Sequence, residues 1–212
     1  VLKGVNLSGN TVESTDVLQG LITMKTGEIL NSRELNKDVM AIQEQYRRDG
    51  YILAKITDMN IDKNGILNLK VNEGILEGYK VKGNTKTKER VILREMRLGD
   101  GDQYEGEKMR RSAERLNRLR YFSAIDSELI PTDRPDEVDL KIKVKEDNTG
   151  ALMGGIGYST YYDVGVTASI MERNLFGRGY QVQLQGFFSW RRTSGVFSFT
   201  NPRVYDTDLS FG

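Results

Sequence analysis

The sequence predicts an α+β fold in which two tandem units of the order strand–helix–helix–strand–strand precede a set of antiparallel membrane-spanning strands. Two observations predict it. The first 147 residues repeat themselves, and the composition changes abruptly after them. Of the 61 charged residues in this 212-residue chain, 52 lie before residue 148, whereas residues 148–212 hold 10 of the 22 glycines. We therefore predict three domains, at residues 1–74, 75–147 and 148–212.

Three segments of the first unit recur in the second, at offsets of 74, 70 and 73 residues. The fall of the offset from 74 to 70 residues corresponds to about one helical turn removed from the second unit. The later rise of the offset by three residues corresponds to a longer hairpin loop in that unit. Length changes of these sizes at these places indicate a structural repeat. The recurring segments are Val5–Thr11, Tyr51–Ala54 and Lys70–Glu73.

Each unit carries two helical patterns. The second pattern is the more regular, with apolar residues spaced by four, three and four after Asn31, which with Glu34 resembles a capping box. The residues that predict the first helix are Val17, Leu21 and Met24, matched by Val91, Glu95 or Met96, and Leu98. Those that predict the second are Leu35, Val39, Ile42 and Tyr46, matched by Met109, Ala113, Leu116 and Leu119 or Arg120.

A short strand opens each unit and a hairpin closes it. The first strand, Val5–Leu7, runs into a Gly-Asn pair that suits a turn. The hairpin has Asn64-Gly65 at its turn, and Leu67, Leu69 and Val71 then alternate with polar residues. This alternation predicts a sheet with one buried and one wet face, which two helices on one side would cover.

The last 65 residues alternate with a period of two. Segments of about ten residues place small or polar side chains on one face and apolar or aromatic ones on the other, which is typical of transmembrane β-strands. We expect turns at residues 161–163, 174–179 and 190–194. This predicts three strands and the start of a fourth. Since the chain opens inside one predicted strand and stops inside another, we expect it to be an internal piece of a longer protein.

The composition excludes several kinds of chemistry. The chain has no His and no Cys, which removes imidazole bases, Ser-His-Asp and Cys-His nucleophiles, His/Cys zinc sites and disulfides. A net charge of +1 gives no bulk attraction for nucleic acid. A carboxylate enzyme using Glu44/Asp49 or Asp133/Asp136 is disfavoured, because no apolar pocket is predicted to raise one pKa. We predict no catalytic residue, no metal and no cofactor.

The second unit and the tail resemble the last POTRA domain and the first barrel strands of the BamA family of outer-membrane-protein assembly factors. The first unit resembles the preceding POTRA domain. A TamA-like or two-partner secretion relative stays open as the alternative. The matching segments are Lys80–Thr85, Leu93–Arg97, Arg115–Leu119 with Tyr121-Phe122, Asp136–Leu140, Val144–Glu146, Asn148–Gly150, Gly155–Tyr158, Asn174–Gly179 and Thr200–Pro202.

The resemblance implies a non-enzymatic protein of the bacterial outer membrane, with its POTRA domains in the periplasm. Its implied partners are nascent outer-membrane β-barrel proteins, accessory lipoproteins of an assembly complex and outer-membrane lipid, with no nucleic acid. The alternative implies a translocation pore that recognises an exported substrate.

The resemblance also implies three kinds of site. Client strands would add to an edge in each unit, although the same charged residues could simply blunt that edge. Those edge residues are Ala54, Lys55, Ile56, Thr57, Asp58 and Met59, and Ala124, Ile125, Asp126, Ser127, Glu128 and Leu129. An accessory protein would dock on Arg97, Asp100 and Asp102, which could equally be a solvated loop.

The third implied site is a lateral gate on the first barrel strand, where glycines could instead serve curvature or a bulge. Its residues are Gly150, Leu152, Gly154, Gly155, Ile156, Gly157 and Tyr158. A basic helix, with Arg110, Arg111, Arg115, Arg118 and Arg120, could contact lipid headgroups. We favour the simpler interpretation that it pairs with Glu107 and Glu114 on a solvated face.

Overall fold

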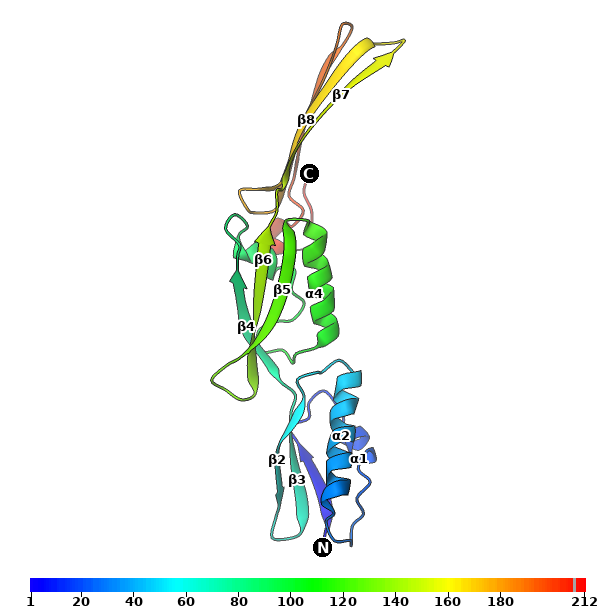
Figure 1. Cartoon of the computed structure of the whole chain (residues 1–212), viewed down its shortest axis with the longest axis vertical. Coiled ribbons are helices and arrows are strands. Elements are labelled where there is room, and N and C mark those ends of the chain that lie inside the picture. Colours follow the sequence, from blue (N-terminus) through cyan, green and yellow to red (C-terminus); the bar gives the residue numbers. More distant parts are fainter. Residues whose placement is uncertain (208) are drawn as a thin grey trace. The chain divides into compact units, whose positions relative to one another are not determined.

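A computed structural model describes residues 1–207 and 209–212. The first repeat contains β1 (Gly4–Ser8), α1 (Thr15–Gly20), α2 (Ser32–Arg48), β2 (Lys55–Ile61) and β3 (Ile66–Asn72). The second contains β4 (Ile75–Lys82), α3 (Glu89–Leu93), α4 (Gly106–Leu119), β5 (Phe122–Pro131) and β6 (Glu137–Glu146). The tail contains β7 (Gly150–Ser159), β8 (Asp163–Leu175), β9 (Tyr180–Ser189), β10 (Thr193–Thr200) and the 3-10 helix η1 (Val204–Asp206). The predicted α+β class and the order of elements in both repeats are confirmed (Figure 1).

The chain divides into two compact units, and the second repeat contributes to both. Unit 1 comprises Val1–Tyr79, Arg97–Arg111 and Leu129–Leu140, and unit 2 comprises Lys80–Met96, Ser112–Glu128 and Lys141–Gly212. The domain boundaries predicted from the sequence stay a prediction.

The first repeat is a three-stranded sheet with both helices on one face (Figure 1). The strand order is β1–β3–β2, with β1 parallel and β2 antiparallel to the central β3. The alternation in β3 directs Leu67 and Leu69 to the core and Asn68 to the opposite face, and both leucines are fully buried with Ile42 and Tyr46 of α2. The predicted one-sided sheet is therefore confirmed.

The predicted extent of the first helix is wrong, and so is the core position of Val17, whereas Leu21 and Met24 do pack against the core. The helix covers only Thr15–Gly20, Leu18 is its buried residue, and the side chain of Val17 is 47% exposed. The predicted pattern continued across Gly20, but glycine is a poor helix former and the helix ends there. In the second repeat α3 likewise ends at Leu93, so Glu95, Met96 and Leu98 lie beyond it.

The second helix and the hairpin are as predicted. Asn31 caps α2, its side chain accepting a hydrogen bond from the Arg33 amide at 3.0 Å. At the hairpin turn Gly65 has a φ of +84°, and the Asp62 carboxylate accepts hydrogen bonds from the Asn64 and Ile66 amides at 2.8 and 2.9 Å. Because the helix start and the turn are local, the sequence pattern was sufficient to predict both, although Asn31 accepts from Arg33 and not from Glu34 as a capping box would have it.

The two repeats share a carboxylate clasp that closes the loop after the first strand. Glu73 accepts hydrogen bonds from the Thr11 and Val12 amides at 2.8 and 2.9 Å. Glu146 accepts them from the amides of residues 85, 86 and 87 at 3.0, 2.9 and 2.6 Å. Glycine precedes both loops with a positive φ, since a Cβ at Gly9 or Gly83 would lie about 2 Å from a carbonyl oxygen of the third strand. These matching contacts support the repeat inferred from the sequence.

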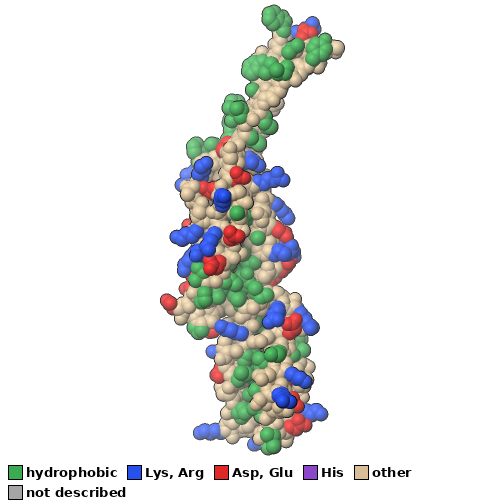
Figure 2. Space-filling model, in the orientation of Figure 1, with side chains coloured by type: hydrophobic (Ala, Val, Ile, Leu, Met, Phe, Trp, Pro, Cys, Tyr) green, Lys and Arg blue, Asp and Glu red, His purple; other side chains and the backbone are tan. Residues whose placement is uncertain are grey.

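The tail forms one antiparallel sheet of order β10–β9–β8–β7. Its register brings one exposed apolar row across all four strands, and the opposite face carries Ser169, Gln183 and Gln185. Figure 2 shows few charged side chains on this part apart from its tip. The predicted alternation is therefore confirmed, and the fourth strand is present. The apolar row consists of Leu152, Ile170, Leu184 and Phe197, which are 54–78% exposed.

Within the described residues, no helix is both long enough and apolar enough to cross a membrane.

The clasp predicts a specific loss of stability when Glu146 is neutralised. Burial alone would raise the pKa of Glu146, but hydrogen bonds from the Thr85 hydroxyl and the loop amides lower it to about 2 from an ordinary 4.5. Its ionised form therefore stabilises the fold above about pH 4.5, and this contribution is lost as the pH falls from 4.5 towards 2. In urea unfolding of the full chain in detergent, we expect Glu146→Gln to lower the free energy of unfolding by about 2 kcal/mol at pH 7, and the difference from wild type to shrink towards pH 2.

Glu107→Gln is the matched control. Hydrogen bonds from Arg110 and Arg111 also lower the pKa of Glu107 to about 2, but its side chain is exposed. Solvent and salt screen such a pair, so the control should change stability little. Equal losses for both variants at pH 7 would contradict the clasp.

Candidate functional site

The predicted client strands lie at sheet edges. β2 is the outer strand of the order β1–β3–β2, and β5 is the outer strand of the order β4–β6–β5. Residues 55–59 and 124–129 fall on these strands, and Ala54 immediately precedes β2. An edge strand directs part of its N–H and C=O groups away from its own sheet, where another strand can pair with them. The structure therefore confirms the edge position, while the binding role of these residues stays a prediction.

The β2 edge is mixed in character. Lys55 and Asp58 are exposed charges, but Met59 and Ile61 also expose 49% and 50% of their side chains. The register between β2 and β3 shifts between Ile56 and Asp58, so Thr57 lies in a bulge. Lys55 and the bulge at Thr57 blunt the first half of the strand, whereas the half from Asp58 to Ile61 pairs regularly with β3 and carries one charge, Asp58.

The β5 edge carries more charge. Asp126 and Glu128 are exposed, and Glu128 forms ion pairs with Lys143 at 2.9 Å and Lys141 at 3.6 Å on β6. The hydrogen bond from Lys143 is the main reason why the pKa of Glu128 is lowered. Since β5 also ends at Pro131, which has no N–H to donate, this edge is the better protected of the two.

The predicted docking loop separates into exposed and structural residues. The Asp102 carboxylate accepts a hydrogen bond from the Gly99 amide at 2.7 Å and so holds the turn. The loop is anchored by Tyr79, whose hydroxyl donates to the Leu98 carbonyl at 2.7 Å. Asp100 is exposed at the tip and, within the described part of the chain, makes no hydrogen bond or ion pair. All three predicted residues, Arg97, Asp100 and Asp102, are exposed, and their binding role stays a prediction.

The predicted gate strand is β7, the outer strand of the tail sheet. It pairs with β8 at ten consecutive positions from Gly150 to Ser159 without a register shift, so its glycines do not form a bulge against β8. Leu152, Ile156 and Tyr158 project from it and are 73–81% exposed. The described strands leave the other side of β7 without a neighbour. That open side could pair with a further strand.

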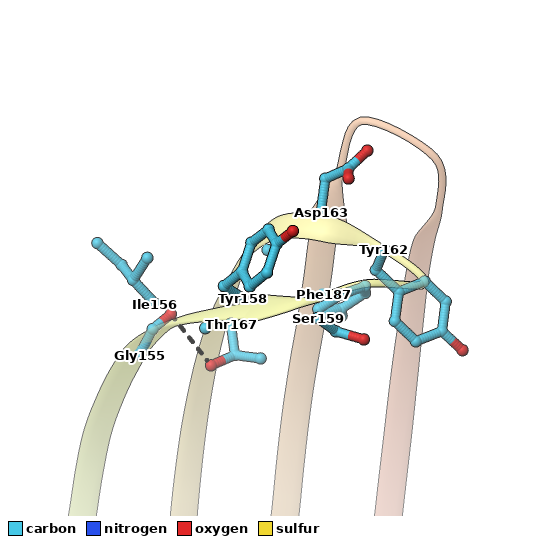
Figure 3. A pocket seen from close by; sticks show the side chains of 10 residues that line it. Gly155, Ile156, Tyr158, Ser159, Tyr162, Asp163, Thr167 and Phe187 are labelled. Carbon is cyan, nitrogen blue, oxygen red and sulfur yellow. Dashed lines mark hydrogen bonds between the residues drawn. The ribbon is translucent and has the colours of Figure 1, made fainter.

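A hollow of about 290 Å³ lies beside the glycines of β7 (Figure 3). Gly155 and Gly157 form one side of it, and Tyr162 and Phe187 lie edge to face across it with ring centroids 5.6 Å apart. The Thr167 hydroxyl donates to the Gly155 carbonyl at 3.3 Å, the contact dashed in Figure 3. The glycines therefore leave space beside the edge strand, which bulkier residues would fill.

Within unit 2, the turn between β8 and β9 docks on the loop that Glu146 clasps. The Asn174 side chain donates to the Thr87 hydroxyl at 2.9 Å, and both residues are buried. The Lys88 amide donates to the Gly177 carbonyl at 2.9 Å. A Cβ on Gly177 would lie 1.9 Å from the Lys86 carbonyl oxygen, so only glycine allows this approach. The tail sheet is thereby fixed to the second repeat.

A buried charge cluster in the same unit escaped the sequence analysis. Glu95 is 2% exposed, and its carboxylate lies 2.9 Å from Arg115 and 3.2 Å from Arg203. Arg94, also buried, pairs with Asp206 at 3.1 Å. Among the described residues, its Nε and Nη2 atoms and Oε1 of Glu95 are buried without a hydrogen-bond partner, although Nε of Arg94 lies 3.8 Å from Oε1 of Glu95. The one signal available beforehand was a glutamate at a position predicted to face the core.

The cluster connects segments far apart in the sequence. Arg203 follows β10 by three residues, 108 positions after Glu95. Removing one member of a buried ion pair leaves the other charge uncompensated, which typically costs about 3–5 kcal/mol. The cluster thus makes the segment after β10 a second attachment of the tail to the repeat.

Three of the five arginines of the basic helix pair as the simpler interpretation expected, whereas Arg115 pairs with the buried Glu95 and Arg120 lies beyond the end of α4. Arg110 and Arg111 lie 2.7 and 3.0 Å from Glu107, and Arg118 lies 3.9 Å from Glu114. Contact of this helix with lipid stays a prediction. The carboxylates considered for an enzyme serve structural contacts: Glu44 pairs with Arg47 at 3.1 Å, and the Asp136 carboxylate accepts a hydrogen bond from Asn72. The described residues contain no group of three or more acidic side chains placed to hold a metal ion.

The fold and these edges define a class of protein: tandem sheet-and-helix modules with an open strand edge, leading into membrane strands. The chain belongs to the POTRA family, whose model, described as a surface antigen variable number repeat, matches residues 1–74 and 76–147.

Named relatives agree with this family. The chain is 67% identical over 132 residues to the outer membrane protein assembly factor BamA of Nitratidesulfovibrio vulgaris, covering 62% of this chain and 17% of that protein. It is 28% identical over 217 residues to BamA of Neisseria meningitidis serogroup B, covering 98% and 27%. The chain therefore spans less than a third of the length of these two relatives.

Solved structures show the same fold. BamA from Haemophilus ducreyi lacking POTRA domains 1–3 matches with a TM-score of 0.63 and 24% identity, over 97% of this chain and 40% of that chain. CdiB from Escherichia coli matches with a TM-score of 0.69 and 20% identity, over 94% and 38%. At these identities the likeness shows the fold alone, so the choice between the two kinds of protein depends on the sequence relatives.

Proposed function

We propose that this chain is the membrane-proximal POTRA pair and the barrel start of a non-enzymatic factor that assembles and inserts β-barrel proteins into the bacterial outer membrane. The observation that carries the proposal is the coexistence, in one chain, of open strand edges on the repeats and an open edge strand on the membrane sheet. The relatives named as outer membrane protein assembly factors support it. The repeats would stand in the periplasm, where client strands arrive.

The edges suit transient holding of unfolded clients. Each net hydrogen bond contributes about 0.5–1.5 kcal/mol, before the entropy of ordering the added strand is subtracted. Four or five bonds to β2 or β5 therefore give weak and reversible pairing. The pairing uses main-chain groups, so it tolerates many client sequences. Such binding allows a client to move on to the membrane sheet.

The β7 edge would act as the lateral gate. Its outer backbone groups need a partner in a membrane, where no water is available to satisfy them. In the intact protein that partner would be the closing strand of the barrel. A client strand could replace the closing strand, because Gly150, Gly154, Gly155 and Gly157 offer it few side-chain contacts to lose.

Site-specific cross-linking in the bacterium that makes the protein tests this function. A photoreactive amino acid at Met59, Ser127 or Ile156 should give adducts with several newly made outer-membrane barrel proteins, because these positions lie on the β2, β5 and β7 edges. Met40, whose side chain is 68% exposed on α2, is the control position and should give few adducts. Adducts with a single secreted protein would favour the CdiB-like translocation pore, and equal adducts from Met40 would overturn strand capture at the edges.

We also propose that the tip of the loop between α3 and α4 docks an accessory lipoprotein through Asp100. The exposed carboxylate, which no described residue pairs with, supports this, because a basic partner group could approach it without breaking such a contact. Asp100→Lys reverses the charge and should lower recovery of accessory lipoproteins with the affinity-purified protein at least about tenfold, as expected for loss of one close charge pair.

Asp133→Lys makes the same change at an exposed loop of the same unit and should leave that recovery unchanged. If both variants retain the accessory proteins, docking does not use Asp100.

A further inference from the structure

Three asparagines lie side by side across the β1–β3–β2 sheet. The register pairs Asn6 with Asn68 and Asn68 with Asn60. The Asn6 side-chain amide donates to Oδ1 of Asn68 at 3.1 Å, and the Asn68 amide donates to Oδ1 of Asn60 at 3.2 Å. The Asn60 amide in turn donates to the Asp58 carboxylate at 3.2 Å. This asparagine ladder, Asn6–Asn68–Asn60, therefore runs in one direction and ends in an acceptor at the open edge.

The two residues of β2 that flank Asn60 belong to rows of apolar side chains on the opposite face of the sheet. Leu7 and Leu69 align with Met59, and Val5 and Leu67 align with Ile61. Leu7, Leu67 and Leu69 are buried and Val5 is partly buried, whereas Met59 and Ile61 are about half exposed. Each row thus continues to β2 and stops where a further strand would cover it. Apolar side chains open at an unpaired edge are unfavourable unless something pairs there.

The second repeat does without this arrangement. The offset of 70 that relates Tyr51 to Tyr121 places Ile130 at the position of Asn60 and Pro131 at that of Ile61. Since the second repeat forms the same fold without a ladder, the ladder is not a requirement of the fold. Its presence in one repeat indicates a role at that edge.

We infer that the β2 edge selects client strands by their side chains as well as by their backbone. This inference rests on the proposed function. The preferred strand alternates: apolar residues opposite Met59 and Ile61 and an uncharged hydrogen-bonding residue, above all Asn or Gln, opposite Asn60. An amide there continues the ladder and also donates to Asp58. Asp or Glu opposite Asn60 would lie beside the Asp58 carboxylate and be repelled by it. Lys70, the basic residue in register with Asp58, lies one strand further from the edge and so does not offset this repulsion.

This alternation is that of a transmembrane β-strand, and the chain itself contains such a segment. In β9 the order Val182-Gln183-Leu184 places an amide between two apolar residues. A peptide of residues 180–189 is therefore a suitable ligand, and the same peptide with its three glutamines changed to glutamate is the charged counterpart. A shift of two residues that brings Tyr180-Gln181-Val182 to the same positions presents the same pattern, so the comparison does not depend on one register.

The test is a titration of the full chain in detergent micelles, followed by the NMR shifts of the β2 amides. Wild type should bind the glutamine peptide about three- to fivefold more tightly than the glutamate peptide, as expected for one or two cross-strand pairs. Asn60→Ala should weaken binding of the glutamine peptide about threefold. Asn6→Ala, at the far end of the ladder on β1, should leave its affinity unchanged. Asp58→Asn should remove most of the discrimination against the glutamate peptide.

The outcomes separate this inference from the function on which it rests. If the peptide shifts the β2 amides but Asn60→Ala and Asp58→Asn bind both peptides as wild type does, side-chain selection is wrong while strand pairing stands. If neither peptide shifts the β2 amides at any concentration reached, β2 is not a client edge, and that part of the proposed function fails as well.

Discussion

The rest of the structure depends on one constraint, that backbone N–H and C=O groups must find partners. A three-stranded sheet covered by helices on one face still has two edges, and the tail sheet has two more. Helices satisfy their own backbone, but edge strands depend on what comes beside them. This constraint explains why the exposed features gather at edges: the bulge and charges of β2, the ion pairs and Pro131 of β5, and the glycines of β7. Under the proposed function, client strands pair with backbone groups that the fold itself leaves unpaired at the sheet edges.

The attachment of the tail to the second repeat gives the edges a fixed frame. The Glu146 clasp shapes the loop at residues 85–87, Thr87 of that loop meets Asn174, and the cluster around Glu95 holds the segment after β10. These contacts are buried and polar, so each requires a definite partner geometry. Within unit 2, the tail sheet is therefore held to the second repeat at two places.

The local parts of the fold could be predicted from the sequence, and the long-range ones could not. The spacing from Leu35 to Tyr46 predicts α2, and Asn64-Gly65 predicts the hairpin between β2 and β3. Both elements depend on residues that are neighbours in the chain. The first helix was misjudged because an apolar pattern continued past Gly20. The ladder of Asn6, Asn68 and Asn60 depends on strand register, which spacing does not give. The cluster around Glu95 joins residues 108 positions apart. The edge strands of the two repeats were assigned through the family resemblance alone.

Amide hydrogen exchange, with and without an unfolded outer-membrane barrel protein, tests most directly whether the edges capture strands. New interstrand hydrogen bonds slow the exchange of the amides that form them. We expect slower exchange in β2, β5 and β7 when the client is added, with little change in β3, which is already paired on both sides. Binding of the client with unchanged exchange at all three edges, or with protection confined to the helices, would contradict it.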